Sequence, residues 1–225
     1  MPVHHRRPFS SATLATMFTL SQLLAFVFAA VLITATPGPD NLMVLGMGIS
    51  RGRRQGIAFG LGCALGCLSH TLWAVLGVSA LVAASPWAFT VLKWMGGGYL
   101  VWLGVNALRH AGKGSIGAMS HAANDSVRAL FFKGMVANAI NPKVVLFFLS
   151  FLPQFVVAEQ GHVGWQLGVL GLLFTLQAGL LFAALAYFAA AIGAWLSRRP
   201  EAGMWLDRIA GMVFIGLGLR IVIGQ

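Results

Sequence analysis

Long apolar segments dominate this sequence and restrict what it can fold into. Of the 225 residues, 58% are hydrophobic and only 9% are charged, whereas a soluble globular domain carries roughly 25% charged residues. The composition predicts a polytopic membrane protein, and the length suits about six spanning helices of roughly 20 residues each. Because the segments are continuous rather than alternating, a transmembrane β-barrel is not expected. The predicted segments cover residues 18–50, 55–84, 87–108, 134–158, 165–196 and 204–222.

Two of these segments are interrupted by prolines and polar side chains, which are costly within a bilayer. Proline removes a backbone donor, and a buried Asp or Lys costs roughly 2.5–3.5 kcal/mol. Such an interruption is tolerated where it lines a hydrated cavity enclosed by protein. The two lie about 105 residues apart, which predicts a binding site between two halves of a transporter. Their residues are Pro37, Gly38, Pro39, Asp40 and Asn41 in the first, and Asn138, Asn141, Pro142 and Lys143 in the second.

The chain divides at its longest polar connection. We expect residues 1–17 to form a disordered leader, 18–109 a first three-helix repeat, 110–133 a cytoplasmic linker and 134–225 a second three-helix repeat. The basic N-terminus also resembles a signal peptide, but the apolar run after it leads directly into the first interruption, so we expect it to be retained. Three spans in each half require opposite orientations in the membrane. The predicted fold is therefore all-α, with six transmembrane helices in two inverted repeats, the first and fourth helices broken.

Basic residues are concentrated in alternate loops. The net charge is +10, and Lys and Arg follow the first, third and fifth segments, whereas the loops after the second and fourth carry none. By the positive-inside rule the odd-numbered loops are cytoplasmic. Six full spans then place both termini outside, while a re-entrant first segment would keep the N-terminus inside, and both alternatives remain open. The distribution leaves no soluble basic surface, so no nucleic-acid partner is expected.

The sequence lacks the residue sets that an enzyme or a metal site needs. It has no Gly-x-x-x-x-Gly-Lys-Ser/Thr loop for ATP, and the spans hold neither a His-x-x-x-His pair nor a Ser/His/Asp set. Cys63 and Cys67, four residues apart, lie on one helix face and are expected to be small packing residues. His70 and Gln177 are expected to have a hydrogen-bonded packing role, with contact to the cavity as the alternative. Glycines at 56, 60, 62 and 66 predict close approach of neighbouring helices. We predict no enzyme, no cofactor and no metal site; an ion or metal exporter of the same architecture is the alternative function.

Several motifs together resemble one family of transporters. They are Thr36-Pro37-Gly38-Pro39-Asp40-Asn41, Leu92-Lys93-Trp94-Met95-Gly96, Asn141-Pro142-Lys143 and Phe151-Leu152-Pro153-Gln154-Phe155. These motifs resemble the lysine-exporter (LysE/RhtB) superfamily of bacterial amino-acid exporters, and the resemblance covers nearly everything after residue 18. It implies a multi-pass protein of the bacterial inner membrane that exports homoserine/threonine-type amino acids or close derivatives, driven by the proton gradient. The implied partners are an amino acid and protons, beside membrane lipid and a possible homo-oligomer.

The charged and amide side chains of the interruptions are the candidate binding residues. Asp40 is expected to take the coupling proton or to contact a substrate ammonium; the alternatives are a helix cap or a pair with Lys143. Lys143 is expected to receive a substrate carboxylate or to act as counter-ion to Asp40, and the alternative is snorkelling to the membrane surface. Asn41, Asn138 and Asn141 supply amides suited to a zwitterion or to exposed backbone groups. Helix starts at the interruptions would also attract a carboxylate.

Overall fold

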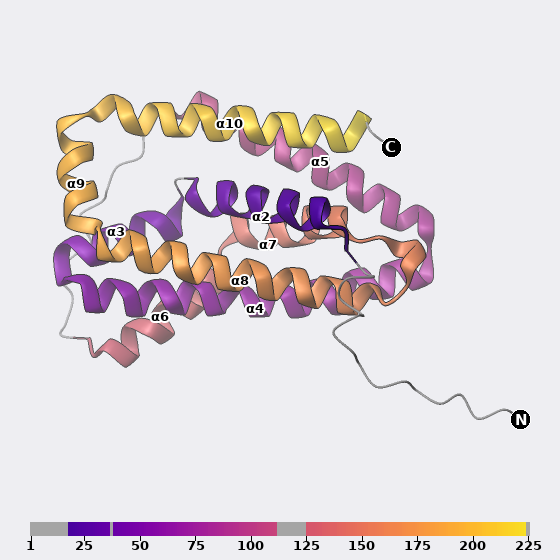
Figure 1. Ribbon diagram of the computed structural model, residues 1–225, viewed down its shortest axis with the longest axis horizontal. Helices are drawn as coiled ribbons and strands as arrows, with labels where there is room; N and C mark the ends of the chain where they lie inside the picture. The colour runs from indigo at the N-terminus through magenta and orange to yellow at the C-terminus, as the bar shows by residue number, and fades with distance from the viewer. Residues whose placement is uncertain (1–17, 37, 112–124, 224–225) are drawn as a thin grey trace, which may run out of the picture.

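The computed structural model describes residues 18–36, 38–111 and 125–223, and every regular element in these ranges is helical. The predicted all-α class is therefore confirmed (Figure 1). The expected leader and most of the expected linker lie outside the described residues, as does Pro37. The elements are α2 (Leu20–Ala35), α3 (Pro39–Arg51), α4 (Arg53–Ala84), α5 (Pro86–Arg109), α6 (Val127–Ala139), α7 (Pro142–Ser150), the short 3-10 helices η1 (Leu152–Phe155) and η2 (Ala158–Gln160), α8 (Val163–Tyr187), α9 (Ala189–Arg198) and α10 (Pro200–Ile223).

Three helices in the described part are long and apolar enough to cross a membrane: α4, α8 and residues 201–220 of α10. Two bent pairs, α2 with α3 and α6 with α7, raise this number to five if each pair forms one span. The expected broken helices are thus confirmed, and the expectation of six spans is met in part. The 24-residue helix α5 is not among the five, although it runs beside α10 along the long axis of the molecule (Figure 1).

The first break arises where a polar cap ends one helix and proline starts the next. The hydroxyl of Thr36 donates to the carbonyl of Leu32 at 2.7 Å, which closes α2. Gly38 precedes α3 in an extended conformation, and Pro39 occupies the first turn, where its missing N–H would have no helical partner anyway. The axes of α2 and α3 differ by 60°.

The second break repeats this design. α6 ends at Ala139, and Asn141 caps α7 by accepting a hydrogen bond from the backbone N–H of Lys143 at 3.1 Å. Pro142 stands at the first position of α7, and the axes of α6 and α7 differ by 59°. In both breaks, proline begins a new helix after the previous one has ended.

Glycines of α4 confirm the expected close packing of helix backbones. A Cβ atom at Gly62 would collide with the carbonyl of Phe131 on α6, and one at Gly134 of α6 would collide with the carbonyl of Phe59 on α4. On the other face of α4, a Cβ at Gly60 would lie 2.9 Å from Cβ of Phe182 on α8. α4 is therefore held between α6 and α8 by close backbone contact, the mode that suits helices in lipid.

The structure corrects two expected boundaries. α6 begins at Val127 rather than near Gly134, because Ser126 caps it by accepting from the N–H of Ala129 at 3.1 Å; the bases Arg128 and Lys133 had suggested a loop. The segment expected at 165–196 is not one helix. α8 ends at Tyr187, and α9 runs across the bundle at one end (Figure 1). The turn at Phe188 contains neither Gly nor Pro, which is why the sequence pattern did not indicate it.

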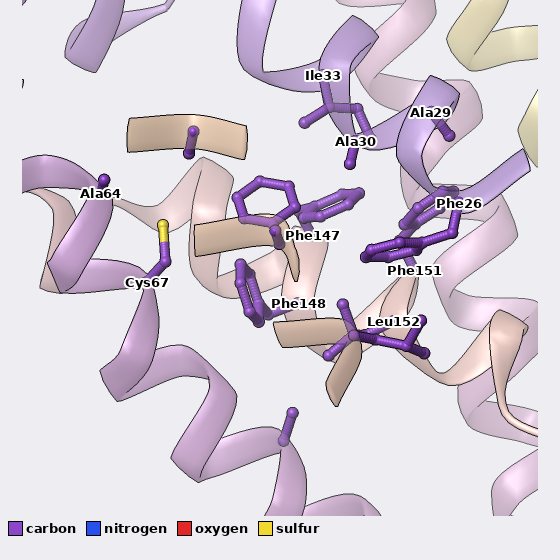
Figure 2. Packing of buried hydrophobic residues seen from close by; sticks show 14 of the residues in the cluster. Phe26, Ala29, Ala30, Ile33, Ala64, Cys67, Phe147, Phe148, Phe151 and Leu152 are labelled. Atoms are coloured by element: carbon purple, nitrogen blue, oxygen red, sulfur yellow. The ribbon is translucent and has the colours of Figure 1, made fainter. Parts of the chain in front are cut away.

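Aromatic side chains fill the space between α2, α7 and α8 (Figure 2). Phe147 and Phe148 of α7 are 1% and 0% exposed. The ring of Phe147 stacks on Phe151 at 4.6 Å between centroids, and Phe148 meets Phe174 of α8 edge-on at 5.0 Å. Phe26 of α2 stacks on Phe151 from the other side at 6.4 Å. The core thus joins helices from both halves directly beside the candidate site.

Candidate functional site

The two breaks meet through a buried hydrogen bond. The amide nitrogen of Asn138, at the end of α6, donates to Oδ2 of Asp40 in the first turn of α3 at 2.7 Å. Asp40 is 5% exposed and Asn138 is 1% exposed. A hydrogen bond to an ionised acceptor is stronger than a neutral one, especially away from water. This contact therefore joins the first half of the chain to the second.

One oxygen of the Asp40 carboxylate lacks a hydrogen-bond donor among the described residues. Its Oδ1 is buried, and no donor within the described residues reaches it. Gly38 rather than Asp40 occupies the cap position of α3, and no side chain of the described residues caps the helix there, so the capping alternative for Asp40 is wrong. An unpaired buried carboxylate oxygen is costly. An added ammonium group would donate to it, whereas a proton would remove its charge.

Helix α4 holds Asn138 in place through two further contacts. The thiol of Cys67 donates to Oδ1 of Asn138 at 3.5 Å, and Nε2 of His70 lies 3.0 Å from the backbone carbonyl of Asn138. Cys67 was expected to be a small packing residue, and His70 was expected to have a hydrogen-bonded packing role. They are buried as expected, but they also fix the orientation of the amide that reaches Asp40. Gly66 leaves the space for this amide, because a Cβ there would lie 2.8 Å from Oδ1 of Asn138.

The other two asparagines satisfy backbone groups that the breaks expose. Nδ2 of Asn41 donates to the carbonyl of Thr34 at 2.7 Å, which ties α3 to the end of α2. Asn141 caps α7 as described above. Of the two roles considered for these amides, contact with exposed backbone is the one seen in this state.

Lys143 points into the first break. Its Nζ donates to the carbonyl of Thr36 at 3.1 Å, and a Cβ added to Gly38 would lie 2.9 Å from the same atom. The ammonium interacts electrostatically with the carboxylates of Asp40 and Asp207. Asp207, on α10, was not among the predicted site residues, although it falls within the predicted segment 204–222. Lys143 is turned toward the other break rather than along α7 to the surface.

A small cavity of about 30 Å³ lies where these side chains converge. A cavity of this size suits a water molecule. Seven of the nine predicted site residues line it: Gly38, Pro39, Asp40, Asn41, Asn138, Asn141 and Lys143. Pro37 is outside the described residues, and Pro142 contributes the start of α7. Sequence reasoning missed the apolar wall from α8, Phe174, Ala178 and Phe182, although their spacing of four residues marks one helix face.

A second buried acceptor lies next to this cavity. Gln177 of α8 donates through Nε2 to the hydroxyl of Thr34 at 2.8 Å, and Thr34 lines the cavity. The carbonyl oxygen of Gln177 is buried, and no donor in the described ranges contacts it. The polar edge of the site therefore extends from Asp40 along α2 to α8.

Comparison with known proteins identifies the family. Residues 17–225 match the profile of the LysE type translocators. The chain belongs to this family. The family consists of transporters for amino-acid efflux and not of enzymes. The chain is therefore a transporter-family protein, and it is a multi-pass membrane protein of bacteria, as its motifs predicted. Among the described residues, no group of three or more His, Cys, Asp or Glu side chains is suited to hold a metal ion.

Three relatives of this LysE-type chain carry names that specify substrates. It is 30% identical to a threonine efflux protein of Salmonella typhi over 90% of this chain and 99% of the relative. It is 28% identical to a homoserine/homoserine lactone efflux protein of Salmonella typhimurium over 89% of this chain and 95% of the relative. It is 27% identical to a leucine efflux protein of an Enterobacter species over 91% of this chain and 96% of the relative. No solved structure matches.

Proposed function

We propose that this protein is a secondary active exporter of neutral amino acids of the homoserine/threonine type across the bacterial inner membrane, in exchange for protons. The observation that carries the proposal is the meeting of two broken helices around Asp40, whose Oδ1 is buried without a donor. Broken helices that face each other are the usual place of a transporter's binding site. The relatives named for threonine and homoserine efflux support this substrate class.

Opposite charges at the site match the two ends of an amino acid. The free oxygen of Asp40 is an acceptor for the substrate ammonium. The ammonium of Lys143 is the partner for the substrate carboxylate. In the present state it donates a hydrogen bond to the carbonyl of Thr36. The starts of α3 and α7 add the positive ends of two helix dipoles on the same side.

The present state is closed around the site. The cavity of about 30 Å³ has room for a water molecule only, and an amino acid is several times larger. Loading therefore requires the breaks to separate, with Lys143 leaving Thr36 and Asn138 moving relative to Asp40. Protonation of Asp40 removes the charge that holds a substrate ammonium, which gives a route for proton exchange.

The arrangement of helices supports an inverted repeat whose halves are residues 18–109 and, with the corrected start of α6, 127–223. The two breaks bend by nearly equal angles, 60° and 59°, and each is followed by a long helix, α4 or α8. We propose that α5 is the sixth crossing, because it lies along α10 (Figure 1). Arg51, Arg53 and Arg198 then lie at the cytoplasmic end. α2 begins near the end where α10 finishes (Figure 1), which favours a full span over a re-entrant first segment.

Export of a metal ion is less well supported. The soft and hard ligands nearest the cavity are Cys67 and Asp40, and a cation pathway needs more such groups. An efflux assay separates the two functions. Cells loaded with a mixture of dipeptides are followed for release of free amino acids, with and without a protonophore.

The assay compares the intact chain with Asp40→Asn and an empty vector, and uses Glu201→Gln as the control, because Glu201 is an exposed carboxylate at the start of α10. We expect protonophore-sensitive release of threonine-like amino acids from the intact chain and the control, and loss of release in Asp40→Asn. Release no greater than that of the empty vector, for every amino acid, would overturn the proposal.

A further inference from the structure

Helix α9 is placed differently from every spanning helix. α4, α8 and α10 run along the long axis of the molecule, whereas α9 runs across it at the end where α4 begins (Figure 1). With ten residues, Ala189–Arg198, it is too short to cross a bilayer. A helix perpendicular to the spanning helices lies parallel to the membrane plane.

One face of α9 is fixed to the transporter. A Cβ at Gly48 of α3 would lie 2.5 Å from Cβ of Ala189, and a Cβ at Gly193 would lie 2.7 Å from Cδ1 of Ile49. Ala189 and Gly193 are buried. α9 therefore packs closely on α3, the helix that carries Asp40 in its first turn.

The opposite face of α9 is apolar and open. Phe188 is 54% exposed and Trp195 is 48% exposed, and with Ala191 and Ile192 they repeat at helical spacing along one side. These four residues border a hollow of about 390 Å³. Such a face in water would be an aggregation hazard, whereas in the membrane interface it lies on acyl chains.

Arginines surround this apolar face at the same end of the molecule. Arg198 and Arg199 end α9, and both are exposed. The guanidinium of Arg53, at the start of α4, lies 4.4 Å above the ring of Tyr187, at the corner between α8 and α9. α9 itself contains no acidic residue; Glu201 follows on α10. The charge complements the anionic lipids of a cytoplasmic leaflet.

We propose that α9 is an amphipathic helix in the cytoplasmic membrane interface, with Phe188, Ala191, Ile192 and Trp195 on acyl chains and Arg198 and Arg199 on the phosphates of anionic phospholipids. Bound lipid holds α9, and through Gly48 and Ile49 it holds α3. The proposal goes beyond amino-acid export and does not depend on which substrate is carried.

The depth of Trp195 is the first test. The protein is reconstituted in phosphatidylcholine vesicles, with or without phosphatidylglycerol, containing lipids brominated at different depths. Subtracting the signal of Trp195→Phe isolates this tryptophan from the others. We expect its fluorescence to be quenched most by bromines close to the headgroups. Absence of quenching at every depth would overturn the proposal.

Lipid retention is the second test. Native mass spectrometry of protein purified from phosphatidylglycerol-containing membranes should show several-fold less bound phosphatidylglycerol for Arg198→Gln and Arg199→Gln. Arg220→Gln, an exposed arginine in the last turn of α10, is the matched control and should retain it. Equal retention in all three variants contradicts the headgroup site. A dimer that Trp195→Ser abolishes would instead assign this face to a second copy of the chain.

Discussion

Asn138 donates to Asp40 across 2.7 Å, and the two residues are 98 positions apart in the chain. The direction of this bond follows from the other contacts of the amide. Oδ1 of Asn138 accepts from the thiol of Cys67, so Nδ2 faces the carboxylate, and the opposite orientation would place two acceptors together. The first half of the chain thus supplies both the carboxylate of Asp40 and the thiol of Cys67, which orients the amide of Asn138 toward that carboxylate.

This relationship predicts energetic coupling between the two residues. Asn138→Ala removes the donor from a buried carboxylate, which should lower stability by about 1–3 kcal/mol. In a double-mutant cycle with Asp40→Ala, measured by unfolding in detergent, the double variant should lose less than the sum of the single variants, by about 0.5–3 kcal/mol. Additive losses would mean that the hydrogen bond contributes nothing to stability.

A methyl group at Gly66 should disturb the same contact from α4. Its Cβ would lie 2.8 Å from Oδ1 of Asn138 and 2.7 Å from the carbonyl of Met135, and neither atom belongs to a flexible chain end. We expect Gly66→Ala to lower the melting temperature and to reduce export severely. Gly77→Ala is the control on the same helix, because no atom of the described residues lies within 4 Å of a Cβ there. Since Ala favours helix over Gly by about 1 kcal/mol, Gly77→Ala should be neutral or stabilising.

Lys143 should distinguish substrates by their carboxylate. If its ammonium binds this group, Lys143→Gln should weaken transport of threonine about tenfold, which is about 1.4 kcal/mol. Threonine amide, which has no carboxylate, should be affected much less. Competition between the two compounds in vesicles measures this difference. An equal loss for both would assign Lys143 to holding the carbonyl of Thr36 alone.

The sequence predicted the breaks well because their residue types have strong local consequences. Proline ends or begins a helix, and Asn141 is a good cap, so α3 and α7 both start within the predicted interruptions. The turn at Phe188 depends instead on tertiary contact between Ala189 and Gly48, which no local pattern encodes. The same holds for Cys67 and His70. Their positions in an apolar segment indicated packing, but only the crossing of α4 and α6 brings them to Asn138.

Asp125 should link the two broken helix pairs in a pH-dependent way. Both of its carboxylate oxygens accept from Nζ of Lys133 on α6 at 2.9 Å, and Arg51 at the end of α3 lies 3.6 Å from Oδ2. The hydrogen bond from Lys133 lowers the pKa of Asp125, and the charges of Lys133 and Arg51 act in the same direction. This stabilisation is therefore present above the ordinary pKa of the carboxyl and is lost as the pH falls through its lowered value in the folded state.

The variant Asp125→Asn tests the direction of this pH dependence of stability. The variant should melt slightly below the intact protein at neutral pH, and the difference should vanish in acid. High salt should reduce the difference at neutral pH, because the group is accessible to solvent. A difference that persists unchanged at acidic pH would mean that Asp125 acts through packing and not through its charge.

Cys67 should report the opening of the site. Its side chain is 1% exposed, yet it lines the cavity beside Asp40, so a thiol reagent reaches it only when the breaks separate. The chain has two cysteines, and Cys63→Ala leaves Cys67 as the single thiol. Labelling by a small maleimide in vesicles should be slow, and a transported amino acid should change its rate, because substrate occupies the opened cavity and shifts the population of closed states.

Cys67→Ala, which keeps the buried Cys63, is the control and should show no response to substrate. If labelling of Cys67 is the same with threonine and without it, the cavity between the two breaks is not the place where substrate binds.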